Sequence, residues 1–176
     1  MNGLRVISTN RKVTKKPNEF HYFFSTVLDY INDYYLLIKQ GELFGFGFPE
    51  DKLKILEKEY NKFILEKNGR WLSVDKKFLT NFSQYIIDGW VDIYGIKNIV
   101  NSLDNFIAEL NSYRKIRKEY YDFLAKNTDF IFYNVDDSYW EIFSNDNTLL
   151  SKIEENLLDK DEINVIKDNI FNRPLI

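Results

Sequence analysis

The chain has no cysteine among its 176 residues and only one histidine. The missing thiols exclude disulfides, thiolate zinc sites, iron–sulfur clusters and a cysteine nucleophile. The single histidine, His21, excludes zinc motifs that need two imidazoles. Glycine and proline are also scarce, at 7 and 3 residues, which argues against long irregular loops. We therefore expect no bound transition metal, no cofactor and no catalytic set.

Long apolar runs are missing as well. No stretch approaches the ~20 apolar residues that a membrane-spanning helix needs, and the first residues, 1–8, lack the pattern of a signal peptide. Hydrophobic residues still make up 44% of the chain, well above the level of disordered proteins. We therefore expect a cytoplasmic, unprocessed, single globular domain over residues 1–176, with residues 1–17 forming a strand and a basic arm.

Charge is unevenly spread along the chain. The net charge is −3, but residues 1–16 hold five bases and no acid, whereas residues 129–176 hold four bases and eleven acids, a balance of −7. The basic arm has no interleaved aromatic residue, so we expect no nucleic-acid binding. The acidic end favours a basic partner, although ordinary solvated helices carry similar charge.

Apolar spacing predicts mostly helices. Residues at i, i+3, i+4 and i+7 predict helices over 18–40, 50–67, 75–94, 96–126, 145–158 and 159–173, with Gly95 as a break. The aromatic and β-branched runs at 130–135 and 139–143, separated by an Asp-Asp-Ser turn, predict an antiparallel hairpin. Residues 4–8 are a candidate third strand. The expected fold is α+β and mainly helical: a bundle of four or more helices with a small antiparallel sheet.

Two motifs resemble functional sites but fail on geometry. His21, Ser25 and Asp29 contain the residue types of a catalytic triad at i, i+4 and i+8. On a helix, however, His21 and Asp29 lie ~12 Å apart along the axis, too far for the aspartate to hold the imidazole. The run at 45–47, Gly-Phe-Gly, lacks the third glycine and the preceding strand of a dinucleotide-binding loop.

Acidic pairs leave an enzymatic alternative open. They occur at Asp29/Asp33, Asp88/Asp92 and Glu154/Glu155. A pair at i, i+4 can bind magnesium or transfer protons if it lies in a cleft, yet such pairs are also common on surfaces.

The predicted hairpin carries the strongest signal for a partner surface. Tyrosine and tryptophan dominate interface hot spots, and acidic neighbours attract a basic partner. Because neighbouring strand residues point to opposite faces, at least one of the two aromatics must pack on the core. The predicted partner-binding residues are Asp136, Asp137, Tyr139, Trp140, Glu141, Asp146, Glu154 and Glu155.

In overall character the chain resembles the small cytosolic immunity proteins of bacterial toxin–immunity systems, including contact-dependent inhibition. The shared features are an acidic, aromatic-rich α+β domain without a catalytic set. This resemblance implies a non-enzymatic inhibitor that binds a basic toxin domain in a tight one-to-one complex. A carboxylate-dependent enzyme and an unrelated cytosolic interaction protein are the alternatives.

Overall fold

A computed structural model describes the parts of the chain that form one sheet and its covering helices. The described residues are 1–8, 29–30, 34–39, 54, 58, 71–74, 91–97, 102–135, 139–158 and 163–174. The predicted helices over 50–67 and 75–94, and most of that over 18–40, lie largely outside these residues.

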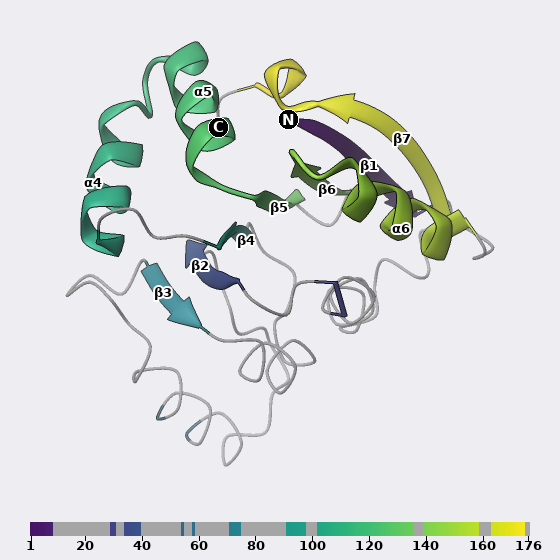
Figure 1. The fold of residues 1–176 in the computed structure, drawn as a ribbon, viewed down its shortest axis with the longest axis horizontal. Coiled ribbons are helices and arrows are strands. Elements are labelled where there is room, and N and C mark those ends of the chain that lie inside the picture. The colour runs from purple at the N-terminus through teal and green to yellow at the C-terminus, as the bar shows by residue number, and fades with distance from the viewer. Residues whose placement is uncertain are drawn as a thin grey trace.

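Seven strands form a single antiparallel sheet (Figure 1). They are β1 (Asn2–Ser8), β2 (Tyr35–Lys39), β3 (Trp71–Val74), β4 (Val91–Ile96), β5 (Phe130–Val135), β6 (Tyr139–Ser144) and β7 (Ile163–Asn169). Their order across the sheet is β3-β2-β4-β5-β6-β1-β7. The first described strand, β1, thus lies between β6 and β7, the last two described strands in the sequence.

Helices cover both faces of this sheet. On one face lie α4 (Leu103–Ser112) and α5 (Arg117–Asn127), and α6 (Asn147–Leu158) packs against β1, β6 and β7. In β7, Lys167 contacts Glu154 of α6, whereas its neighbour Asp168 contacts Arg5. Because neighbouring strand residues point to opposite faces, α6 and Arg5 lie on opposite sides of the sheet. A short 3-10 helix, η3 (Ile170–Asn172), follows β7.

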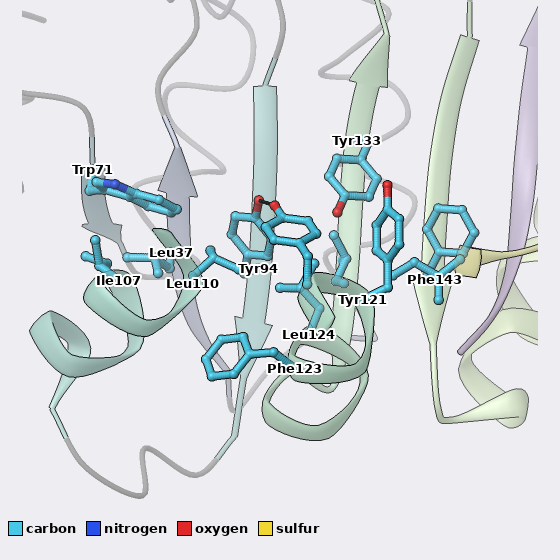
Figure 2. Packing of buried hydrophobic residues seen from close by; sticks show 13 residues of the cluster. Leu37, Trp71, Tyr94, Ile107, Leu110, Tyr121, Phe123, Leu124, Tyr133 and Phe143 are labelled. Atoms are coloured by element: carbon cyan, nitrogen blue, oxygen red, sulfur yellow. Dashed lines mark hydrogen bonds between the residues drawn. The ribbon is translucent and has the colours of Figure 1, made fainter. Parts of the chain in front are cut away.

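Aromatic side chains fill the space between the sheet and α4 and α5. Tyr94, Tyr133 and Phe143 come from three adjacent strands and are fully buried with Leu110 and Leu124 of the helices. Figure 2 shows these side chains spread along the layer between the strands and the two helices. Large rings bury much apolar area per residue, and Leu37 of β2, Trp71 of β3 and Ile170 of η3 complete this core.

The predicted helical bundle is wrong. The sheet is the main element, and only three α-helices are described in full. Residues 35–39, 91–96 and 163–169 are strands where helices were expected. The run Leu36-Leu37-Ile38 is buried throughout, as expected of a strand covered on both faces, and a short run of this kind cannot be distinguished from a buried helix by periodicity alone.

The predicted helix over 96–126 is also wrong in its extent. The structure has two helices here, separated by a turn at 113–115, and Ser102 caps the first by accepting the Asn105 N–H. Residue 96 belongs to β4. Gly95 lies within this strand and does not break it.

Three other predictions are confirmed. The hairpin over 130–143 corresponds to β5 and β6, which pair in antiparallel register from Phe130↔Ser144 to Val135↔Tyr139. Residues 4–8 belong to β1, which pairs with β6. The helix predicted over 145–158 is α6.

Candidate functional site

One register position carries polar residues across five neighbouring strands. Lys39 of β2 pairs with Asp92 of β4, Asp92 with Tyr133 of β5, Tyr133 with Glu141 of β6, and Glu141 with Arg5 of β1. Directly opposed residues of an antiparallel sheet share a face. These five residues, the polar row, therefore lie on the face that α4 and α5 cover, because Tyr133 belongs to the core beneath those helices.

Glu141 is the central acid of the polar row. Its side chain has no exposed area, yet both of its oxygens are engaged. Oε1 accepts hydrogen bonds from Nε and Nη2 of Arg5 at 3.0 and 2.8 Å, and Oε2 accepts one from Nε of Arg173 at 2.7 Å. A buried carboxylate is tolerated only when it is paired and hydrogen-bonded in this way.

Two arginines pair with Glu141, one from an earlier part of the chain and one from a later part. Arg173 follows η3, is only 7% exposed, and lies 3.7 Å above the centre of the Tyr133 ring. Arg5 lies 4.8 Å from the centre of the Tyr139 ring and also binds Asp168 Oδ2 at 2.9 Å. The negative charges of Glu141 and Asp168 therefore balance the positive charges of Arg5 and Arg173. Burial opposes the charge of Arg173, but Tyr133 and Glu141 outweigh it, so the pKa of Arg173 is raised.

The other end of the polar row combines a carboxylate with phenols. Asp92 Oδ2 lies 3.4 Å from Lys39 Nζ and accepts a hydrogen bond from the Tyr94 hydroxyl at 3.3 Å. The Tyr94 hydroxyl is also 3.3 Å from that of Tyr120. Burial raises the pKa of Tyr120 to about 12 and the pKa values of Tyr94 and Tyr133 well above the usual value. These phenols are therefore neutral at physiological pH.

The Tyr133 hydroxyl is the exception within this network. It is buried and has no hydrogen-bond partner among the described residues. Each of the three carboxylates, by contrast, has a cation beside it: Glu141, Asp168 and Asp92. The network therefore links β1, β6, β7 and the segment after η3 through ion pairs. Among the described residues, no group of three acids or histidines is placed to hold a metal ion.

The predicted partner-binding residues of the hairpin have different environments. Asp136 and Asp137 lie outside the described residues. Tyr139 and Trp140 are both half-buried, so neither is a fully buried core residue. Glu141 is enclosed between Arg5 and Arg173. It has no surface to offer a partner while these contacts hold, and we therefore leave it out of the proposed surface.

The predicted partner-binding acids at α6 differ in the contacts that they make within the protein. Asp146 is exposed, and its Oδ1 accepts the backbone N–H groups of Thr148 and Leu149, so it caps the helix. Glu154 is partly exposed and lies 3.4 Å from Lys167. Glu155 is exposed. The structure thus brings Asp146 and Glu155 to the surface of one helix.

The other motifs gain little from the structure. Asp29 is exposed, whereas His21 and Ser25 lie outside the described residues. Asp92 lies on a strand, where a spacing of four does not bring carboxylates together as it does on a helix. Its predicted companion Asp88 is also outside the described residues.

Sequence reasoning missed most of the polar row. Arg5 lies in the predicted strand over 4–8 but was counted among the bases of the arm, and Lys39 and Asp92 were predicted to lie in helices. A signal was present in Leu4-Arg5-Val6, where one charged residue alternates with two that prove fully buried. Such alternation indicates a strand with one polar face, but the acid that pairs with Arg5 lies far along the chain and could not be identified.

No protein-family model, curated protein or solved structure matches this chain. Among the helices of the described residues, none has the length and apolar character that crossing a bilayer requires.

Proposed function

We propose that this protein is a non-enzymatic binding protein of the immunity type, which neutralises a basic toxin by direct complex formation. The observation that carries the proposal is the end of the β5–β6 hairpin. Tyr139 and Trp140 are only half-buried there, whereas the next four residues of β6 are fully buried. Both side chains thus keep part of their surface accessible, Tyr139 while also packing against the core and Arg5, and aromatic residues of these types commonly anchor a partner.

The surroundings of these aromatics favour a basic partner. Asp136 and Asp137 precede them in the sequence, and α6 adds exposed Asp146 and Glu155. Of the bases that pair with Glu141, Asp168 and Glu154, Lys167 and Arg173 are already counted in the sequence balance of −7, and Arg5 is added from outside it. Steering toward a basic surface then depends on the acids at the turn and on α6.

The first step of the test is to identify the partner and measure what binding does to it. The tagged chain is purified from its native cells, and the protein that co-purifies is then prepared alone. We expect a basic protein whose toxic activity is abolished at a one-to-one ratio. A partner that keeps its full activity at saturation contradicts the proposal.

The second step locates the surface. We expect the reversal of Asp136 and Asp137 to Lys to slow association and weaken its salt dependence, and Trp140→Ala to cost ~2 kcal/mol of binding free energy or more. The matched control reverses Asp104 and Glu109, exposed acids of α4, and should leave the affinity unchanged. Equal affinity for all of these variants would rule out the hairpin as the binding surface.

An enzyme of the carboxylate-dependent type is the second candidate, and Asp92 is the residue that favours it. Its side chain is 20% exposed and lies beside Lys39 and the phenol of Tyr94, a set of groups that can exchange protons. Asp92→Asn separates the two candidates. A binding protein keeps its inhibition of the partner in this variant, whereas an enzyme loses turnover.

A further inference from the structure

The strand β7 forms one rim of the sheet. It is last in the strand order and pairs with β1 along its whole length, from Asn169 opposite Asn2 to Ile163 opposite Ser8. Figure 1 shows β7, in yellow, curving along the outer edge of the molecule. An edge strand directs backbone N–H and C=O groups away from its neighbour, and these groups can template pairing with another chain.

Exposed apolar side chains gather at this rim. Among the described residues the exposed large hydrophobic residues are Tyr35, Ile116, Ile166 and Phe171. Ile166 is 44% exposed on β7, and Phe171, 42% exposed, follows directly in η3. Ile116 precedes Arg117, whose guanidinium donates to the Phe171 and Arg173 carbonyls. Two of the four, Ile166 and Phe171, therefore lie on β7 or directly after it.

Only one charged side chain of β7 is left to protect this edge. Natural edge strands are commonly blunted by charged side chains or proline. Of the two charged residues of β7, Asp168 is hydrogen-bonded to Arg5, whereas Lys167 lies 3.4 Å from Glu154 and its side chain is 77% exposed. The strand has no proline. Its remaining side chains are apolar residues and asparagines, which can pair with another strand.

We propose that β7 pairs antiparallel with β7 of a second copy of this chain, across a two-fold axis that passes beside Ile166. In this register Ile166 opposes its own copy, Asn164 opposes Asp168, and Val165 opposes Lys167. No two like charges stand directly opposite each other, and an amide faces a carboxylate, so the strand is complementary to itself. The dimer covers Ile166 and extends one sheet through both copies.

This inference goes beyond the proposed function and does not depend on it. The toxin-binding surface is argued from the end of the β5–β6 hairpin, whereas the dimer is argued from β7 and η3. Loss of either feature by mutation is therefore expected to leave the other measurable.

The absence of native cysteine makes a direct test possible. Directly opposed residues of antiparallel strands have Cα atoms ~4.5–5.5 Å apart, within the range of a disulfide. We expect Ile166→Cys to form a covalent dimer under mild oxidation, seen on a non-reducing gel. The matched control is Glu155→Cys, an exposed position on α6, which should remain monomeric. Crosslinking of Ile166→Cys no faster than the control would overturn the proposal.

Mass measurement in solution provides the second readout. A dimer with a dissociation constant of ~1 μM is largely intact at ~10 μM. At this concentration we expect the native chain to have twice its monomer mass of 21.2 kDa in light scattering. Ile166→Lys should be monomeric and should keep its circular dichroism spectrum, whereas Tyr35→Lys, which removes an exposed large hydrophobic residue from β2, should remain dimeric. A native chain that is monomeric at this concentration refutes the dimer. If Ile166→Lys fails to fold, the crosslinking comparison decides.

Discussion

At the scale of single residues, Glu141 has the most demanding environment in the described part of the chain. It combines complete burial with contacts to Arg5 and Arg173, which come from segments 136 and 32 residues away. Removing one member of such a buried set leaves the others as uncompensated charges. The stability of the fold should therefore depend on this acid far more than on any exposed one.

We predict that Glu141→Gln lowers the free energy of unfolding by ~3 kcal/mol or more, because Arg173 would then be buried without a counter-charge. Urea denaturation monitored by tryptophan fluorescence gives the measurement. Glu155→Gln is the control, since Glu155 is exposed, and should change stability by ~0.5 kcal/mol at most. A loss in Glu141→Gln no larger than that in the control would show that the ion pairs contribute nothing net.

Tyrosine ionisation should make the fold sensitive to alkali. The pKa of Tyr120 is raised to about 12 by burial, against ~10 in the unfolded chain. Its contribution is therefore fully present below pH ~10 and is lost as the pH rises toward 12. We predict that Tyr120→Phe makes the fall of stability between pH 10 and 12 shallower by ~1.4 kcal/mol per pH unit. Urea titrations at several pH values test this, and equal slopes in the variant and the native chain contradict it.

The sequence offered a partial view of these residues. It placed residues 139–141 in a hairpin strand, which the structure confirms, but assigned Glu141 to a partner surface. The side chains that enclose Glu141 come from β1 and from the segment after η3, and no local pattern at Glu141 indicates them. The sequence around Tyr139 and Trp140 does not indicate whether the neighbouring acid faces solvent or an arginine.

At the scale of elements, predictability followed the strength of the local pattern. The β5–β6 hairpin was predicted because aromatic and β-branched runs flank a turn, and α6 because its apolar residues repeat at helical spacing. In contrast, β2 and β4 are buried on both faces, and their apolar runs matched a helical repeat as well as a strand. These strands are defined by their neighbours in the sheet, which a single sequence does not reveal.

A close contact between Gly95 and Phe130 fixes the pairing of β4 with β5. The two residues are directly opposite, and a Cβ at Gly95 would lie 1.9 Å from the Phe130 ring. We predict that Gly95→Ala lowers the free energy of unfolding by ~1–3 kcal/mol because the ring must move in a packed core. Urea denaturation of Gly95→Ala, Phe130→Leu and the double variant gives the coupling.

The coupling should favour the double variant, which should lose at least ~0.5 kcal/mol less than the sum of the single losses. Strictly additive losses would show that the glycine matters for the backbone and not for the ring.

At the scale of the whole molecule, the two end segments of the described chain meet in one place. Arg5 of β1, Asp168 of β7 and Arg173 after η3 gather around Glu141 of β6. This arrangement could not be predicted, because the sequence indicated neither β7 nor the position of β1 between β6 and β7. The α+β class of the fold could be predicted from the sequence, whereas the relative size of the sheet and the helices could not.

The position of β1 also has a consequence for synthesis on the ribosome. Its first residue pairs with Ser144 and Asn169, so β1, which precedes the other described strands, has no described partner strand until β6 has left the exit tunnel. Translation proceeds at ~5–20 residues per second, which leaves Leu4 and Val6 without their final burial for many seconds. During that interval the nascent chain carries an apolar strand that chaperones can bind. Completion of β7 then closes the sheet around a strand made long before it.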